Sequence, residues 1–135
     1  MRTVTVKIES ASPYYQSAPL VTPKNNKESA QDYEERCWRD RIHATADGFV
    51  EIPPMAFKFA IDAVAKKLRM QVPGKGKSEF GSLLRGGVVV MNGITLPIKK
   101  ESVEGRAYFL NADGKRGSGT RVKRIMPHIE KWAGE

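Results

Sequence analysis

The chain has 135 residues, which is enough for one domain with one modest hydrophobic core. Its apolar fraction of 40% and charged fraction of 28% are ordinary for a globular protein, which excludes a wholly disordered chain. The formal net charge of +8 favours a polyanionic partner, either nucleic acid or another anionic surface, over the alternative of a soluble protein that merely happens to be basic.

The single cysteine, Cys37, limits the chemistry that the chain can carry. One cysteine rules out an internal disulfide and any zinc site built on paired cysteines, and it fits a reducing compartment. The opening residues lack the apolar run of a signal peptide, and no stretch approaches the roughly 18 apolar residues of a membrane span. We therefore expect a cytoplasmic protein without a membrane segment.

The first third of the chain predicts short elements around a long loop. Residues 3–9 alternate between apolar and polar side chains, which is typical of a half-buried strand. Residues 10–29 are rich in proline, serine and asparagine and predict a loop. Residues 30–41 are densely charged around a few apolar positions and predict a short helix. An Asp-Gly turn then leads into a short strand over residues 49–52.

The strongest element is an amphipathic helix over residues 55–70, which follows Pro53-Pro54 and stops at Pro73-Gly74. Residues 72–87 are rich in glycine and cations and predict a long mobile loop with one short turn of helix. The apolar positions of the predicted helix recur at helical spacing: Phe57, Ala60, Ile61, Val64, Ala65 and Leu68.

The last third predicts strands and turns. Two apolar runs, 88–91 and 94–98, flank Asn92-Gly93, which is a strong hairpin signal. Residues 104–110 and 121–126 predict a second pair of strands joined by a glycine-rich turn. The order indicates one α+β domain over residues 1–135, with one main amphipathic helix on a mostly antiparallel sheet. A ferredoxin-like fold needs a second crossover helix, so we expect an incomplete form of it or a different α+β arrangement.

Two basic, glycine-rich segments are the main candidate sites. Gly74-Lys75-Gly76-Lys77-Ser78 ends like a phosphate-binding loop, but the full motif needs a glycine where Gln71 stands and a preceding strand, which argues against an NTPase. Exposed glycine N–H groups and lysines can hold phosphates without catalysis. Residues 113–124 form a second basic segment, and the two together predict the walls of a groove. Two solvated, solubilising loops are the alternative.

Four aromatic residues are candidates for stacking on bases: Tyr14, Tyr15, Tyr108 and Phe109. Tyr14 and Tyr15 stand in a polar loop and are the best of them, whereas we expect Phe109 in the core. The predicted nucleic-acid or partner-binding residues are Lys66, Lys67, Arg69, Lys75, Lys77, Arg85, Lys115, Arg116, Arg121, Lys123, Arg124, Tyr14 and Tyr15.

An enzymatic function finds no positive support in the sequence. The acidic residues between Glu28 and Asp40 are interleaved with arginines, so local ion pairs explain them better than a metal site. His43 and His128 lie far apart and match no catalytic pattern. We expect a non-enzymatic protein without cofactor or metal, although a nuclease of unfamiliar pattern stays open.

Four motifs occur in an order that resembles a group of small phage and prophage proteins without an assigned activity. The resemblance covers most of residues 30–135. The motifs are Trp38-Arg39-Asp40-Arg41, Ile52-Pro53-Pro54-Met55-Ala56-Phe57, Val72-Pro73-Gly74-Lys75-Gly76-Lys77 and Asp113-Gly114-Lys115-Arg116-Gly117.

A fainter similarity is to RAMP-type proteins, the RRM-like backbone subunits of CRISPR effector complexes, which line up along guide RNA. It rests on the succession of Asp47-Gly48, a short strand, Ile52-Pro53-Pro54 and an amphipathic helix. Such proteins tend to carry a glycine-rich segment near the C-terminus, which this chain lacks. The resemblance therefore implies a shortened relative with an incomplete RRM-like unit and an exposed sheet edge.

Two functional hypotheses follow. In the first, a phage protein in the cytoplasm of its bacterial host mimics or binds a CRISPR effector backbone subunit and interferes with the complex, as an anti-CRISPR. In the second, the chain binds single-stranded RNA or DNA during phage replication or recombination.

Overall fold

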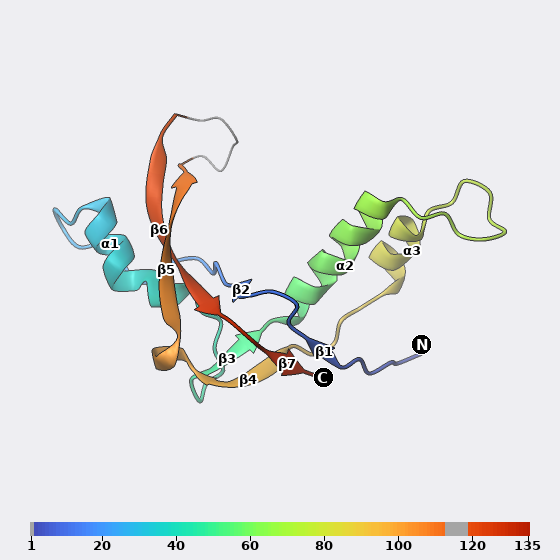
Figure 1. Cartoon of the computed structure of the whole chain (residues 1–135), viewed down its shortest axis with the longest axis horizontal. Coiled ribbons are helices and arrows are strands. Elements are labelled where there is room, and N and C mark those ends of the chain that lie inside the picture. Colours follow the sequence, from blue (N-terminus) through green and yellow to red (C-terminus); the bar gives the residue numbers. More distant parts are fainter. Residues whose placement is uncertain (1, 113–118) are drawn as a thin grey trace. The chain divides into compact units, whose positions relative to one another are not determined.

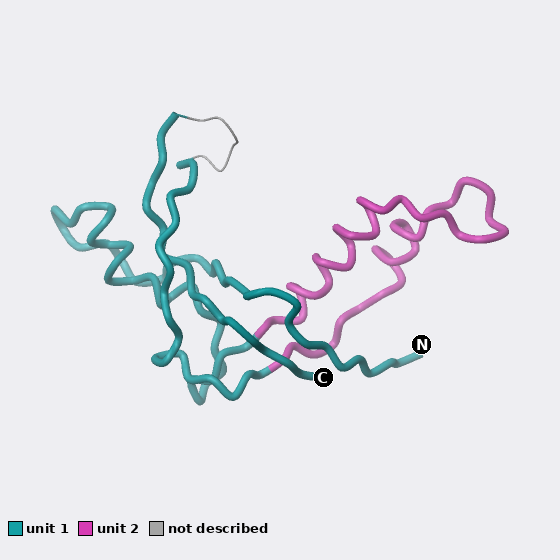
Figure 2. The backbone as a smooth tube through the Cα atoms, viewed as in Figure 1, with its two compact units in different colours: residues 1–51, 95–135 teal, residues 52–94 magenta. Residues whose placement is uncertain are grey.

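The computed structural model describes residues 2–112 and 119–135 (Figure 1). They form two compact units: unit 1 comprises residues Met1–Glu51 and Thr95–Glu135, and unit 2 comprises Ile52–Ile94 (Figure 2). Helices and antiparallel sheets occur together, which confirms the α+β class. Unit 2 is an insertion in the sequence of unit 1, and the single domain over residues 1–135 stays a prediction.

The main sheet of unit 1 has the strand order β2-β6-β5. Strands β5 (Glu104–Asn111) and β6 (Arg121–Ile129) pair antiparallel along their length, which confirms the two strands predicted in this region. Strand β2 (Tyr14–Tyr15) pairs antiparallel with the other edge of β6, opposite Ile129 and His128. Strand β2 lies in the segment predicted as a loop, so that prediction is wrong at these two residues.

Strand β2 is held in place by a buried glutamine beside it. The side chain of Gln16 is 1% exposed; its Nε2 donates to the carbonyl of Glu51 at 2.7 Å, and its Oε1 accepts from the N–H of His43 at 2.8 Å. The glutamine thereby satisfies two backbone groups far along the chain, which buried polar groups require. One side chain thus ties this polar segment to the backbone at His43 and Glu51.

Two further sheets have two strands each, and they correct two sequence predictions. Strand β1 is confined to Ile8–Glu9 and pairs with β7 (Ala133–Gly134). The strand predicted over residues 3–9 is therefore wrong before Ile8, because residues 3–7 are not in a strand. Strand β3 (Phe49–Ile52) pairs with β4 (Ile94–Lys99). The predicted hairpin about Asn92-Gly93 is wrong, because residues 88–93 form no strand and β4 takes a partner from much earlier in the chain.

Helix α1 (Ala30–Cys37) and the 3₁₀ turn Trp38–Arg41 form as predicted and pack on β6. Trp38 lies beneath the sheet, where a Cβ added to Gly105 would come within 3.1 Å of its ring. Such a Cβ would also lie 2.7 Å from Cγ2 of Ile125, so only glycine fits at this point of β5. The buried apolar residues of the described chain are Cys37, Trp38, Ile42, Val50, Ile52, Ile94, Leu96, Val103 and Ile129.

Unit 2 is a pair of helices, α2 (Pro54–Leu68) and α3 (Phe80–Gly87). Helix α2 confirms the predicted amphipathic helix. The first turn of α3 lies beside the backbone of Ala65, in the last part of α2. Near the end of α3, the carbonyls of Leu84 and Arg85 accept bonds from the Nζ of Lys58, which stands early in α2. The two helices therefore run in opposite directions. Neither helix contains a buried residue, so the apolar side chains of both helices are at least partly exposed to solvent.

Candidate nucleic-acid interface

The loop between α2 and α3 is tied by its own backbone. The N–H of Phe80 donates to the carbonyl of Met70 at 2.9 Å, and the N–H of Val72 donates to the carbonyl of Ser78 at 2.8 Å. Gly74 and Gly76 have φ angles of +74° and +58°, a left-handed conformation that glycine adopts without steric cost. The prediction of a long mobile loop is therefore wrong in part, because the chain closes into a tight turn and then enters α3.

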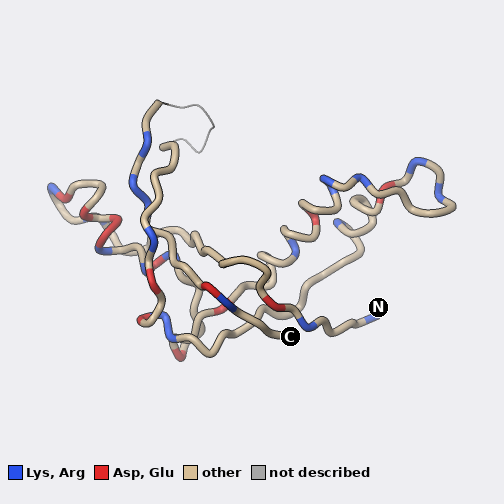
Figure 3. The backbone as a smooth tube through the Cα atoms, in the orientation of Figure 1, with Lys and Arg blue, Asp and Glu red and all other residues tan. Residues whose placement is uncertain are grey.

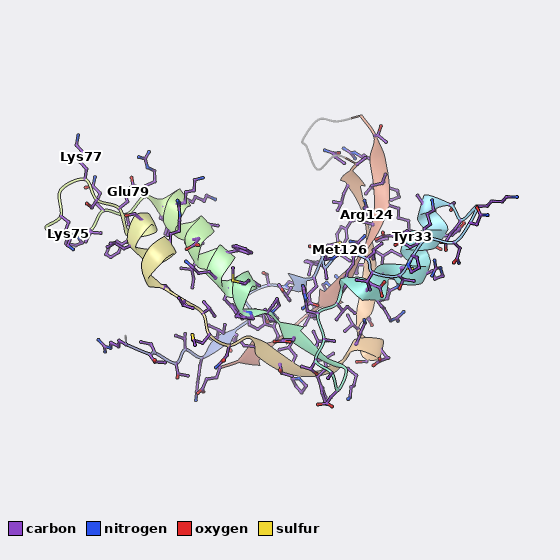
Figure 4. All side chains as sticks on the ribbon, turned by 180° about the vertical axis from the view of Figure 1, so that it is seen from behind. Tyr33, Lys75, Lys77, Glu79, Arg124 and Met126 are labelled. Carbon is purple, nitrogen blue, oxygen red and sulfur yellow. The ribbon has the colours of Figure 1, made fainter. Side chains whose placement is uncertain are left out.

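This turn presents lysines to solvent. Lys75 and Lys77 project from the tip of the loop, and Glu79 lies at its base (Figure 4). Helix α2 ends beside the loop, and Arg69 caps it in a left-handed conformation with φ 48°. We define the basic apex of unit 2 as the cations of this region: Lys66, Lys67, Arg69, Lys75 and Lys77.

The basic apex is poorly neutralised. Arg69 pairs with Glu79 at 3.1 Å, but no carboxylate among the described residues lies within ion-pair distance of the other four cations. Unit 2 holds seven lysines and arginines against Asp62 and Glu79, so its formal charge is +5 out of the +8 of the chain (Figure 3). Part of this placement has a structural explanation, since cations near a helix C-terminus interact favourably with the helix dipole. That explanation covers Lys66 and Lys67 but not Lys75 and Lys77.

Arg85, also predicted, belongs to unit 2 but not to the basic apex. It lies in the last turn of α3, where its carbonyl accepts from Lys58 at 3.2 Å. The ammonium group of Lys58 also bonds Asp62 at 2.6 Å, so it is used within the helix pair. The remaining predicted cations are in unit 1.

In unit 1 the predicted cations differ in what surrounds them. Lys123 pairs with Glu35 at 2.7 Å, and Arg124 pairs with Glu34 at 3.3 Å, so both join β6 to α1. Arg121 is exposed at the start of β6. Lys115 and Arg116 lie outside the described residues. The groove between the two basic segments therefore stays a prediction.

The two predicted stacking residues, Tyr14 and Tyr15, differ in how far their side chains are exposed. Tyr14 is half-buried, and its ring meets Trp132 edge-on at 6.2 Å between centroids. Burial raises the pKa of its phenol, and a bond with Gln16 lowers it in part. Tyr15 is 38% exposed, and its hydroxyl accepts a bond from Tyr108 at 2.9 Å, which raises the pKa of the Tyr108 phenol. Of the two tyrosines, Tyr15 is the more exposed, although its ring packs against Tyr108 and His128.

Phe109 corrects a prediction. The sequence places it in the core, but it is 69% exposed. Phe109 stands opposite Lys123 in the pairing of β5 with β6. It lies on the same face of the sheet as Gly105, and Trp38 packs on that face at Gly105. The cover that Trp38 provides at Gly105 does not extend to Phe109.

Glu28 and Glu34 hold local ion pairs, as predicted, whereas Glu35 pairs with the distant Lys123. Glu28 bonds Arg36 at 2.8 Å, which lowers the pKa of this carboxyl to about 2. His128 is buried, with its Nε2 2.6 Å from a carboxylate oxygen of Glu130. In the ranges that the structure describes, no group of three or more His, Cys, Asp or Glu side chains can hold a metal ion.

Comparisons with known proteins return no relative. The chain matches no protein-family model, and neither a curated protein nor a solved structure matches it significantly. In the described part of the chain, no helix has the length and apolar character needed to cross a membrane. The case for a function therefore rests on the residues themselves.

Proposed function

We propose that the protein binds nucleic acid through the basic apex of unit 2, holding phosphate groups without catalysing a reaction. The observation that carries the proposal is the set of four lysines without a carboxylate partner among the described residues, in a unit with a formal charge of +5. Clustered, unneutralised cations attract the phosphate backbone and release its condensed counterions. The exposed loop tip lets Lys75 and Lys77 reach phosphates that a flat surface would not meet.

The first test is the salt dependence of binding. Each cation that contacts a phosphate releases counterions, so the logarithm of the binding constant falls linearly with the logarithm of salt concentration. Contacts from all five cations of the basic apex give a slope of about −3.5 for a single strand and about −4.5 for a duplex. Fluorescence anisotropy with a labelled oligonucleotide over a salt series measures it. Absence of binding at low salt, or binding that salt does not weaken, would contradict the proposal.

A second proposal rests on the open edge of β5. The N–H of Ile125 donates to Glu34 at 2.9 Å, so it faces away from β5. Ala107 stands opposite Ile125 in the ladder, so the two residues form a pair without hydrogen bonds between them, and the N–H and C=O of Ala107 point to the outer edge of β5. Gly105 and Phe109 lie two positions to either side of Ala107, so their N–H and C=O groups point to the same outer edge. In the described chain no strand pairs with that edge. Such an edge can accept a strand from another protein.

We propose, as this second function, that the edge of β5 engages a CRISPR effector backbone subunit and interferes with its complex. The expected incomplete RRM-like unit belongs to this proposal, because an incomplete sheet leaves an edge such as that of β5 unpaired. Adding the protein to a purified type I effector complex is expected to reduce target binding, and the Ala107→Pro variant, which cannot donate at the edge, is expected to act more weakly. Unchanged target binding at large excess of the protein contradicts it.

A further inference from the structure

One face of α2 leads directly to the basic apex and carries an exposed aromatic ring. Met55, Phe59 and Ala63 follow one another at intervals of four residues, and Lys66 continues the same face at the apex. Phe59 is 65% exposed and Met55 is 50% exposed. Helix α3 packs on a different face of α2, at Lys58, so it leaves this face open.

Phe59 is the exposed aromatic residue of unit 2. The other two phenylalanines of the unit, Phe57 and Phe80, are half-buried. Seven residues separate Phe59 from Lys66, which is about 10 Å along the helix axis. A stretched nucleic-acid strand spans that length with few nucleotides, so one ligand can contact both the ring and the cations.

We infer that the basic apex takes single-stranded nucleic acid, with an unpaired base stacked on Phe59 and the neighbouring phosphates on the lysines. The inference rests on the proposed binding of nucleic acid by the apex and adds the strand type. A base in a duplex is stacked inside the helix, whereas an unpaired base offers its face to an aromatic ring. The charge of +5 on unit 2 selects a polyanion over an apolar protein partner for this face.

The test compares the Phe59→Ala variant with the wild-type protein on a single strand and on a duplex of the same sequence. Loss of one stacked base is expected to weaken single-strand binding about 10-fold, with duplex binding unchanged. Separate DNA and RNA strands show which sugar is preferred. Phe59→Tyr is expected to retain wild-type affinity, because the ring is kept.

Val64→Ala is the matched control, because Val64 is 55% exposed on another face of the same helix and carries no ring. It is expected to bind like the wild-type protein. Equal affinity of Phe59→Ala and wild type for the single strand, or equal losses for both ligands, overturns the inference and leaves phosphate binding intact. A wild-type protein that binds neither ligand instead overturns the proposed function.

Discussion

Charge reversal of the four unpaired lysines of the basic apex is expected to abolish nucleic-acid binding. The four changes replace attraction to phosphate with repulsion, so affinity near physiological salt should fall by more than about 100-fold. The slope of the salt dependence should become shallower by about one unit for each lysine that no longer binds a phosphate. Anisotropy titrations over a salt series measure both effects. The changes are Lys66→Glu, Lys67→Glu, Lys75→Glu and Lys77→Glu.

A matched control separates position from net charge. Reversing four exposed lysines of unit 1 makes the same change, and both variants lower the formal charge from +8 to zero. The control is expected to keep the salt slope and most of the affinity. If both variants lose binding equally, the net charge of the chain and not the apex governs it. The control changes are Lys7→Glu, Lys24→Glu, Lys27→Glu and Lys131→Glu.

The second large effect is expected at Glu34, whose side chain is 3% exposed. Its carboxylate accepts two bonds from Arg41, at 2.8 and 3.2 Å, one from the N–H of Ile125 and one from Arg124. Glu34→Gln keeps the shape but leaves Arg41, with an 11% exposed side chain, without its counter-charge. Breaking a buried pair in this way costs about 3–5 kcal/mol in the free energy of unfolding.

Urea unfolding followed by tryptophan fluorescence measures this loss, because Trp38 and Trp132 both belong to unit 1. Glu35→Gln is the matched control. Glu35 is exposed and pairs with Lys123, so its loss should cost no more than about 1 kcal/mol. Equal losses at the two positions would contradict the structural role of Glu34.

The same carboxylate predicts how stability depends on pH. Burial raises the pKa of Glu34, but the bonds from Arg41, Ile125 and Arg124 outweigh it and hold the pKa below the ordinary value of a glutamate. A carboxyl with a lowered pKa in the folded state contributes fully above its unfolded pKa, and the contribution fades as the pH falls through the folded value. The wild-type protein should therefore lose more stability than Glu34→Gln does when the pH falls below about 4.3, the ordinary pKa of a glutamate. Parallel pH curves for the two proteins would contradict this.

Local patterns predicted the elements that are stabilised locally. The helix over residues 55–70 follows from apolar spacing, and the strands over 104–110 and 121–126 follow from alternation about a turn. The pairing of β4 with β3 was missed because it depends on a distant partner, whereas Asn92-Gly93 offered a local one. Helix α3 was predicted only as one short turn of helix, because its glycines hide the helical spacing of Phe80, Leu83 and Leu84.

The positions of lysine and arginine in the sequence could locate the basic apex, but they could not show that its cations are less neutralised than those of unit 1. Lys123 and Arg124 look equally available in the sequence, yet their carboxylate partners stand 88 and 90 positions earlier. Phe59 escaped notice because it lies off the apolar stripe used to predict the helix. Its spacing from Met55 and Lys66 was the available signal.

NMR titration of the isotope-labelled full chain with a short oligonucleotide tests most directly whether nucleic acid contacts the basic apex. Amide shift changes are expected to concentrate in residues 64–79, and Phe59 and its neighbours are expected to shift as well when the ligand is single-stranded. Changes confined to the β2-β6-β5 sheet of unit 1, or no changes at a saturating excess of oligonucleotide, would contradict it.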